Sequence, residues 1–489
     1  MAASTPPTPL YPSVEPPSRA SPRADVGVQE ADVVVVGAGL TGAMSALLMA
    51  QRGLSVTMYE KRPDLREEFK REEAEKAGQP ADFWGTSLSA TKRSINLALS
   101  ARGQAALEKV GLLERIMAHA IPMYCRAMHS HDGKLSFQPY GKSGQHINSI
   151  SRRLINTLLL DECQAKGVKM HFEHKLVAMD SHSKITMMHA NGTRLTVRAR
   201  IILGCDGAYS GVRSSMLRIS RANFSRHYIE HGYKELTIPP TSSGEYALQP
   251  SDALHIWPRH EFMLIALPNP DKTFTATLFA PFATMDALKT NQAVKDFFQE
   301  QFPDAVPVIP ELDKQFFAES AGSLVTVRMD PWNLRDKVLL MGDAAHAVVP
   351  FFGQGMNAGF EDALALDEMM EAHHDDFSAA VPAFAAARQP SGDAIATLSF
   401  ENYVEMRSHT ASTMFLLRKK VEGVLHAILG SNWIPRYSMV AFTRIPYDEV
   451  VRRTEFQEKV VTGVTWAGLL AVTGAVAYGA AKLLRNARL

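Results

Sequence analysis

The stretch that most constrains the fold is residues 32–42, Asp-Val-Val-Val-Val-Gly-Ala-Gly-Leu-Thr-Gly. An uninterrupted run of β-branched valines is typical of a strand buried on both faces of a parallel sheet. Gly37, Gly39 and Gly42 follow at the GxGxxG spacing, which permits a tight turn, close approach of a pyrophosphate and close packing of the next helix. The spacing therefore predicts strand, turn and helix, with phosphates at the N-terminus of that helix.

The residues that follow complete a βαβ unit. Residues 43–51 are rich in Ala, Leu and Met, which favour a helix, and residues 54–59 form a second strand that ends at Glu60. An acid at this place accepts hydrogen bonds from an adenosine ribose. Tyr59 and Arg62, which flank Glu60, are further candidate cofactor contacts. The fingerprint predicts a dinucleotide site and does not distinguish NAD from FAD.

Length and composition limit the other possibilities. A chain of 489 residues is too long for one compact core, so we expect two or three structural units. The net charge is +1, and neither a basic domain nor a stripe of aromatic and basic residues is present, which gives no reason to expect a nucleic-acid partner. Three cysteines lie far apart without a CxxC pair and are interpreted as reduced thiols, with no metal site.

The two ends of the chain depart from the globular average. Residues 1–30 are rich in proline, alanine and serine, so a disordered arm is expected. Residues 460–481 carry no charge and lie between Lys459 and Lys482. This run is long enough to cross a bilayer, and a transmembrane anchor is favoured over the alternative, a buried core helix.

Two later strands also end in an acid. Residues 198–203 lead to Gly-Cys-Asp-Gly at Asp206, and residues 338–341 lead to Gly-Asp at Asp343, before a glycine-rich turn and a helix over residues 360–372. Acids at the carboxyl ends of parallel strands lie where α/β sheets bind ligands. Asp206 equally fits the cap of the next helix. Asp343 can accept from a ribityl hydroxyl, and the backbone at Met356 and Asn357 can face an anionic ring edge.

The pattern between these segments predicts an inserted domain. Residues 226–325 contain β-rich runs separated by Pro, Asn and Asp, as in an antiparallel sheet. The predicted fold is therefore α/β: a Rossmann-like cofactor domain in two parts, residues 31–225 and 326–390, an inserted sheet domain over 226–325, a helical region over 391–455 and the anchor.

Several side chains leave alternatives open. Arg126, among apolar strand residues, is either a surface charge or a carboxylate binder. His346 is either a catalytic base or a hydrogen-bonded structural histidine; the structural role is favoured, because nothing in the sequence completes a relay. Asn402 and Tyr437 could line a ligand site, although composition alone indicates packing.

Taken together, residues 32–42 with Glu60, residues 204–207, and residues 342–343 with 355–357 resemble the FAD-dependent aromatic hydroxylases related to p-hydroxybenzoate hydroxylase. Residues 93–100, 204–210, 255–259 and 342–362 are most similar to the members that hydroxylate L-kynurenine, and the resemblance covers residues 31–455. It implies that NADPH reduces FAD, that O2 adds at the flavin C4a position, and that this hydroperoxide hydroxylates the ring carbon beside the aniline amine. The alternatives are an FAD monooxygenase for another aromatic substrate and a membrane-tethered scaffold that keeps FAD as a structural ligand.

The resemblance also assigns residues. Those implied to contact FAD are Thr41, Glu60, Ala98, Arg152, Leu176, Asp343, Met356 and Asn357. Arg126 and Tyr140 are implied to hold the substrate carboxylate, which suits a bidentate guanidinium, with Asn402 and Tyr437 completing the pocket. Animal members imply a location in the mitochondrial outer membrane, with the catalytic domain facing the cytosol.

The sequence departs from the family in two places. Residues 66–91 are longer and more charged than usual, which is expected to alter access to the flavin. Gly211 stands where a hydroxyl residue is common, which weakens one expected cofactor contact.

Overall fold

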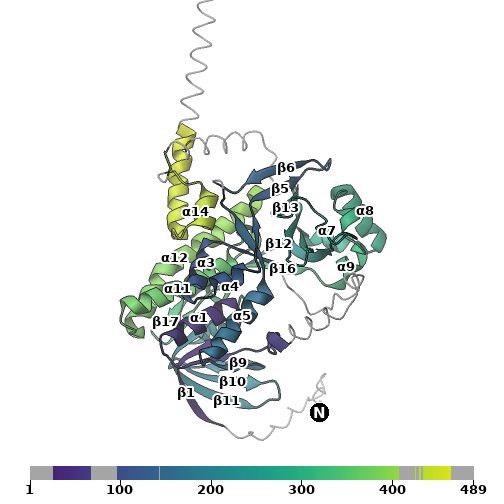
Figure 1. Cartoon of the computed structure of the whole chain (residues 1–489). Helices are drawn as coiled ribbons and strands as arrows, with labels where there is room; N and C mark the ends of the chain where they lie inside the picture. The colour runs from purple at the N-terminus through teal and green to yellow at the C-terminus, as the bar shows by residue number, and fades with distance from the viewer. Residues whose placement is uncertain are drawn as a thin grey trace, which may run out of the picture.

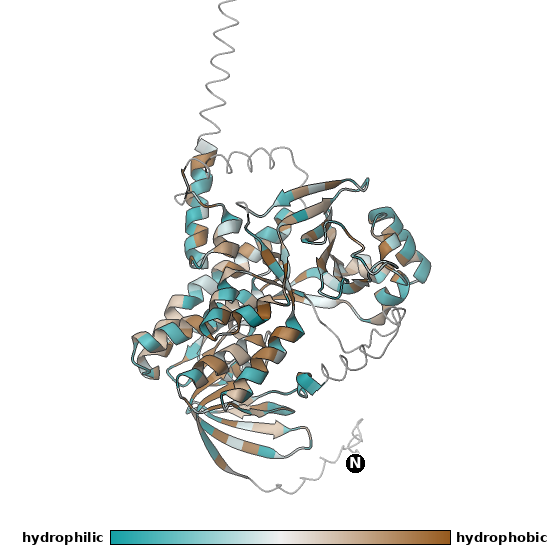
Figure 2. Cartoon of the chain, viewed as in Figure 1, coloured by the Kyte–Doolittle hydropathy of each residue, from teal (hydrophilic) through white to brown (hydrophobic). Residues whose placement is uncertain are grey.

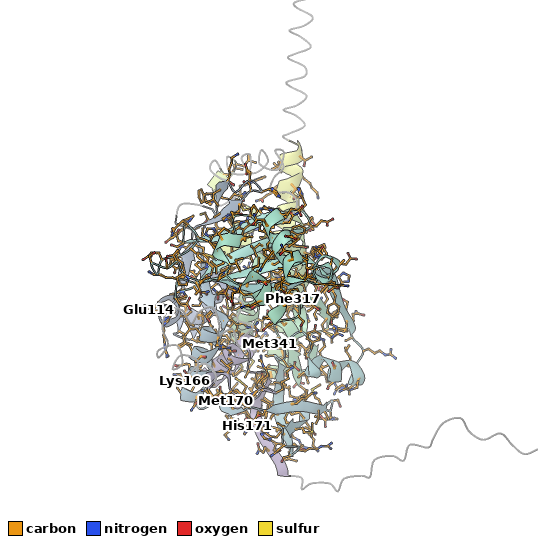
Figure 3. The ribbon with its side chains drawn as sticks, turned by 90° about the vertical axis from the view of Figure 1, so that its right-hand side faces the viewer. Glu114, Lys166, Met170, His171, Phe317 and Met341 are labelled. Carbon is orange, nitrogen blue, oxygen red and sulfur yellow. The ribbon has the colours of Figure 1, made fainter. Side chains whose placement is uncertain are left out.

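The computed structural model describes residues 26–67, 96–141, 144–406, 425, 429–430 and 433–463. Two sheets lie at different levels, with most of the helices of the cofactor domain between them (Figure 1). Hydrophobic residues are concentrated in the central strands and in the helices against them (Figure 2). In Figure 3, His171 of the lower sheet and Phe317 beside the upper sheet mark the two levels, and side chains fill the space between them.

The lower sheet is the predicted cofactor sheet, in the order β17-β18-β11-β1-β2-β8, with β10 and β9 continuing from β11. The pairs β1·β2, β1·β11, β11·β18 and β2·β8 are parallel. Its strands are β1 (Val26–Val36), β2 (Val56–Tyr59), β8 (Lys169–His171), β9 (His174–Met179), β10 (Lys184–His189), β11 (Arg194–Gly204), β17 (Asn333–Leu334) and β18 (Val338–Leu340).

The central place of β1 confirms the interpretation of the valine run. Val33, Val34 and Val35 are completely buried between neighbouring strands and the helices above. The strand begins earlier than expected, at Val26, because Val26, Gln29 and Glu30 pair with β11. The predicted disordered arm over residues 1–30 is therefore wrong for residues 26–30, and residues 1–25 lie outside the described part.

Helices cover the upper face of this sheet, where α1 contacts both α5 and α11. The helices of the cofactor domain are α1 (Leu40–Gln51), α3 (Ala101–Lys109), α4 (Leu113–Met117), α5 (Arg152–Ala165), α6 (Gly211–Ile219), α10 (Asp343–His346), the 3-10 turn η3 (Pro350–Phe352) and α11 (Gly355–Ala372). The predicted helix over residues 360–372 thus begins a turn earlier, which places Met356 and Asn357 in its first turn.

The upper sheet has the order β16-β12-β15-β14-β13-β5-β6. Its strands are β5 (Cys125–His129), β6 (Leu135–Pro139), β12 (Asn223–Ile238), β13 (Ala253–Arg259), β14 (Phe262–Pro268), β15 (Phe274–Pro281) and β16 (Gly322–Asp330). The expected antiparallel pairing within residues 226–325 is confirmed by β12·β15, β13·β14 and β14·β15, and a parallel pair is added where β13 meets β5. The sheet also takes β5 and β6 from before residue 226.

Two smaller parts complete the described fold. A sheet in the order β3-β7-β4 contacts the upper sheet through β4 and β13; its strands are β3 (Asn96–Leu99), β4 (Ile121–Met123) and β7 (Ile147–Ser151). The remaining helices are α7 (Phe282–Ala287), α8 (Asn291–Gln301), η2 (Val306–Val308), α9 (Leu312–Ala318), α12 (Phe377–Val404) and α14 (Arg436–Phe442). The C-terminal region is thus helical where it is described.

Within the described ranges, no helix is both long and apolar enough to span a bilayer. The expected anchor over residues 460–481 lies outside those ranges from residue 464 onward, as does the charged segment from residue 68.

Candidate functional site

The glycine turn after β1 has the geometry of a pyrophosphate site. A Cβ at Gly37 would lie 2.5 Å from the carbonyl oxygen of Cys205, and a Cβ at Gly42 would lie 2.0 Å from that of Gly37, so close packing requires both glycines. A Cβ at Gly39 would meet no atom within 4 Å. Gly39 also begins α1 without a side-chain cap, so open space lies beside free helix amides, as an anion requires.

Glu60 is buried at the end of β2 and faces this turn. Its Oε2 accepts from the Ala38 amide at 2.9 Å, and its Oε1 accepts from the Arg62 amide at 3.0 Å and from Arg62 Nε at 2.8 Å. Burial opposes ionisation, but Arg62 and Ala38 outweigh it and hold the pKa of Glu60 below its ordinary value. The acid is therefore a fixed carboxylate, as ribose binding needs, and Arg62 orients it.

Tyr59 contacts the glycine turn through its backbone, while its side chain is buried in the fold. Its ring is completely buried and stacks on His171 with 4.9 Å between centroids, and burial raises the pKa of its phenol to about 12. Its carbonyl oxygen accepts from the Gly37 amide at 2.7 Å. The described contact of Tyr59 with the cofactor turn is thus made by its backbone.

The first and the third of the three cofactor motifs meet at Thr41. A Cβ at Gly342 would lie 2.6 Å from Thr41 Oγ1, and a Cβ at Gly359 would lie 2.3 Å from the same atom. The first turn of α1 therefore packs against the end of β18 and the start of α11, which both lie about 300 residues later in the sequence. Asp343, next to Gly342, is exposed beside this junction, as a ribityl contact requires.

Asn357 joins α11 to β3. Its Oδ1 accepts from the Ser100 amide at 2.9 Å, while its Nδ2 donates to the carbonyl oxygens of Ala98 at 2.8 Å and Gly353 at 2.7 Å. These contacts use the side-chain amide for the protein itself, so a flavin contact at Asn357 would come from its backbone.

Asp206 combines both roles that the sequence left open. Its Oδ2 accepts from the amides of Gly211 at 2.6 Å and Val212 at 3.2 Å, which caps α6. Its Oδ1 is buried and has no hydrogen-bond partner among the described residues, which leaves an acceptor for a ligand hydroxyl. Leu176 lies beside Gly211, and Arg152 is exposed at the start of α5.

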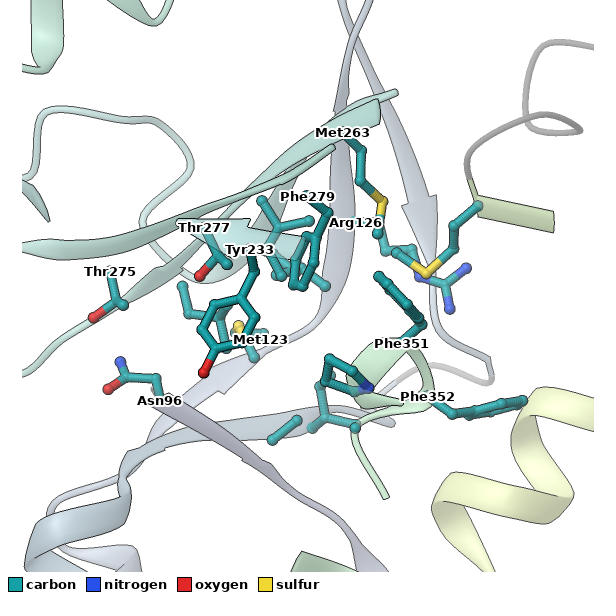
Figure 4. A pocket seen from close by; sticks show the side chains of 18 of the residues that line it. Asn96, Met123, Arg126, Tyr233, Met263, Thr275, Thr277, Phe279, Phe351 and Phe352 are labelled. Atoms are coloured by element: carbon teal, nitrogen blue, oxygen red, sulfur yellow. The ribbon is translucent and has the colours of Figure 1, made fainter. Parts of the chain in front are cut away.

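A cavity of about 120 Å³ lies between the upper sheet and the elements β3 and η3 (Figure 4). Its walls are mainly apolar, including Met263, Phe279 and Phe351, and of the described residues that line it only Arg126 carries a charge. Figure 4 shows Arg126 on one side of the cavity and Asn96, Thr275 and Thr277 on the other. Ala98 and Gly353 also line it, so the cavity adjoins the β3–α11 junction.

Arg126 lies against two tyrosines. Its Cζ is 4.6 Å from the ring centroid of Tyr437 and 5.3 Å from that of Tyr140, and the two rings stack 5.3 Å apart. Burial opposes the charge, but the two phenols and Glu405 hold the pKa of Arg126 above its ordinary value. The Tyr140 hydroxyl is buried without a hydrogen-bond partner among the described residues. A permanent cation beside an unsatisfied hydroxyl suits a carboxylate ligand.

Of the four predicted substrate residues, Arg126 and Tyr437 line the cavity, and Tyr140 and Asn402 do not; Asn402 lies apart from the tyrosine pair. It is buried, and its Nδ2 donates to the Phe351 carbonyl oxygen at 2.7 Å. Phe351 lines the cavity, so the described contact of Asn402 with the site runs through that residue. Arg126, Tyr140 and Tyr437 thus lie together, whereas Asn402 contacts the cavity wall through Phe351.

His346 belongs to a buried charge network. Its Nε2 lies 2.5 Å from Asp362 Oδ2, and its ring stacks on Trp332. Arg388 bonds to both Asp362 and Glu361. These contacts favour the structural role for His346.

The network continues to Arg102. The Arg102 Nη1 donates to both carboxylate oxygens of Glu361 at 2.7 and 2.9 Å, its Nε donates to the Val440 carbonyl oxygen, and its guanidinium lies over the Tyr447 ring. Neither this network nor the cavity residues Asn96, Thr275 and Thr277 were predicted from the sequence; the alternation of Thr275 and Thr277 in β15 is the one local signal for those two threonines.

The site fits FAD through four features: the open space over Gly39, the Glu60 carboxylate, the Asp206 Oδ1 that has no partner among the described residues, and the exposed Asp343. The fold and the site define an FAD-binding oxidoreductase. Residues 91–375 match the family model described as FAD binding domain, and residues 32–79 match that of FAD dependent oxidoreductase.

Curated relatives give the particular family. The chain is 43% identical over 438 residues to kynurenine 3-monooxygenase of Sus scrofa, covering 89% of this chain and 88% of that protein. It is 40% identical to the enzymes of the same name from Caenorhabditis elegans and Salinispora tropica, covering 91% of this chain and 97% of each. The chain therefore belongs to the kynurenine 3-monooxygenase family, and FAD is its cofactor.

Solved structures agree on the fold. A tetrameric form of 2-methyl-3-hydroxypyridine-5-carboxylic acid oxygenase aligns with a TM-score of 0.63 at 21% identity, covering 80% of this chain and 95% of that chain. At this identity the likeness extends to the fold alone.

Proposed function

We propose that this protein hydroxylates L-kynurenine to 3-hydroxy-L-kynurenine with NADPH and O2. The observation that carries the proposal is Arg126, which is the one charged residue among the described residues that line a mainly apolar cavity and which lies against the rings of Tyr437 and Tyr140. L-Kynurenine carries an α-carboxylate and an α-ammonium at one end and an aromatic ring at the other, so its carboxylate has a partner in Arg126 and its ring suits the apolar walls.

Arg126 and Tyr140 bind and orient the substrate. The guanidinium donates to the carboxylate, and so does the Tyr140 hydroxyl, which has no hydrogen-bond partner among the described residues. Tyr437 stacks on Tyr140 and holds both groups in place. With the carboxylate fixed at this end, the substrate ring extends among apolar side chains toward Ala98 and Gly353, beside the cofactor junction.

The apolar walls keep water out of the reaction. Met263, Phe279 and Phe351 offer no hydrogen bond to water, and Asn402 holds the backbone of Phe351 in position. Bound FAD supplies the chemistry of the reaction, which is the activation of O2 after reduction by NADPH. The task of the protein is to place the substrate ring and to protect that chemistry from water.

The test is NADPH oxidation by the purified, FAD-loaded protein with and without L-kynurenine, together with assay of 3-hydroxykynurenine. Stimulation with matching product supports the proposal. FAD retention without stimulation contradicts it and favours one of the alternatives, another aromatic substrate or a scaffold. A neutral substrate would leave the Arg126 charge without a partner, which favours L-kynurenine.

We also propose that residues 460–481 anchor the protein in the mitochondrial outer membrane, with the catalytic domain facing the cytosol. The support is the uncharged run between Lys459 and Lys482. In alkaline carbonate extraction of mitochondria, the full chain should stay with the membrane and a chain ending at residue 459 should be released. Release of both would contradict the anchor.

A further inference from the structure

The first half of β12 carries an exposed aromatic and cationic surface. Residues 223–228 are all exposed, and β15 pairs with β12 only from His231 onward. Phe224 and Tyr228 are 37% and 44% exposed on this segment, and Tyr209, in the loop before α6, is 59% exposed. Such rings normally avoid water, so their gathering at one place is a feature of a binding surface.

Arg226 lies at the centre of this surface. Its Cζ is 5.3 Å from the ring centroid of Tyr209 and 5.8 Å from that of Tyr228, and the two phenol oxygens are 3.4 Å apart. Within the described part of the chain, Arg226 makes no ion pair. Its guanidinium is therefore held by rings while its charge is left uncompensated.

A second cation lies beneath it. Arg213 is buried under Phe224, with 4.7 Å between its Cζ and the ring centroid; burial lowers the pKa of Arg213, Asp206 partly opposes this, and the nearby Arg226 lowers the pKa further. Two guanidinium groups close together favour an anion, and aromatic faces beside them favour a planar base. A nucleotide phosphate with its adenine combines both chemistries.

The surface adjoins the FAD site. Tyr209 belongs to the loop that begins at Asp206, and Arg213 donates to the carbonyl oxygens of Ala208 at 2.6 Å and of Ala344, next to Asp343, at 2.7 Å. A nucleotide held here would lie beside both loops that we assign to FAD. The sequence contains no second GxGxxG after a strand, so a reduced dinucleotide needs a surface of this kind.

We propose that Tyr209, Arg226 and Tyr228 bind the adenosine end of NADPH, with its 2′-phosphate on Arg226 and its adenine against a tyrosine ring. This inference rests on the proposed use of NADPH. It assigns the docking of the reductant to a surface outside the substrate cavity.

The test uses 2′,5′-ADP, which carries the 2′-phosphate and lacks the nicotinamide, in calorimetric titration of the FAD-loaded protein. Arg226→Gln should raise the Kd by about tenfold or more, because a charge-assisted contact is lost, and Arg226→Lys should restore part of the affinity. Arg194→Gln, an exposed arginine at the start of β11, is the matched control and should leave the Kd unchanged. In turnover, Arg226→Gln should raise the KM for NADPH, leave kcat unchanged and leave the KM for NADH unaffected.

Equal binding of 2′,5′-ADP by wild type and Arg226→Gln would overturn the inference. So would loss of FAD or weaker L-kynurenine binding in that variant, since either would indicate a structural role. The proposed function fails separately, if L-kynurenine does not stimulate the wild-type protein, because 2′,5′-ADP binding requires no turnover.

Discussion

Replacing Arg126 by alanine tests the substrate assignment most directly. The variant removes the cation from the cavity, so the substrate carboxylate would enter a mainly apolar space beside Tyr437 and Tyr140, without a charged partner among the described lining residues. Removing one member of a buried, hydrogen-bonded charge pair costs about 2 to 5 kcal/mol. Because Arg126 is half-buried, we take about 3 kcal/mol, which raises the Kd for L-kynurenine by roughly 150-fold. FAD should be retained, because Arg126 lies outside the glycine turn.

The assay is a titration of the FAD-loaded protein with L-kynurenine, followed by the change in flavin absorbance. Kynuramine, which has the same ring, ketone and ammonium but no carboxylate, is the matched ligand control: it should bind wild type weakly, and Arg126→Ala should not weaken its binding further, because that variant removes a like charge. Arg126→Lys keeps the charge without the two-pronged geometry and should fall between. Equal affinity of wild type and Arg126→Ala for L-kynurenine would refute the carboxylate assignment.

Four further substitutions test the substrate site, the glycine turn and the buried charge network. Tyr140→Phe removes a hydroxyl that has no described partner, so urea unfolding of the free protein should show no loss of stability, while the Kd for L-kynurenine rises about fivefold, as loss of about 1 kcal/mol gives. Gly42→Ala should destabilise the cofactor-free protein by about 2 to 3 kcal/mol, because its Cβ meets a backbone oxygen, whereas Gly39→Ala should keep that stability and lower only FAD affinity; equal unfolding curves for the two would contradict the turn geometry. Burial opposes ionisation of Asp362, but His346 and Arg388 hold its pKa at about 2, below the ordinary 3.8, so about 2 kcal/mol of stability is present above roughly pH 4 and is lost as pH falls toward 2. Asp362→Asn should abolish that part of the acid dependence in urea titrations and cost about 3 kcal/mol at neutral pH, and an unchanged acid profile would argue against the pair.

The cofactor half of the fold could be predicted from the sequence because its signals are local. The valine run, the glycine spacing and Glu60 all fall within residues 32–60, and each constrains its immediate neighbours. The steric contacts at Gly37 and Gly42 are the physical reason for that spacing. Asp206 and Asp343 followed from the same rule for strand ends.

The substrate side could not be predicted in the same way, because long-range pairing creates it. Arg126 reaches the cavity because β5 pairs in parallel with β13, with Arg126 opposite Leu254. No local pattern around residue 126 specifies that partner, which is why residue patterns alone left Arg126 undecided. The same holds for Asp362 and His346, whose contact depends on how α11 packs over α10.

The buried network around Arg102 has a consequence for the minimal enzyme. Arg102 belongs to α3 of the cofactor domain. It nevertheless donates to the Val440 carbonyl oxygen and lies over the Tyr447 ring, and both of these residues belong to the C-terminal region. A chain shortened to end before residue 440 would leave a completely buried guanidinium without these partners. The residues up to about 447 are therefore part of the catalytic body, and any shortened enzyme made for solubility must be cut beyond them.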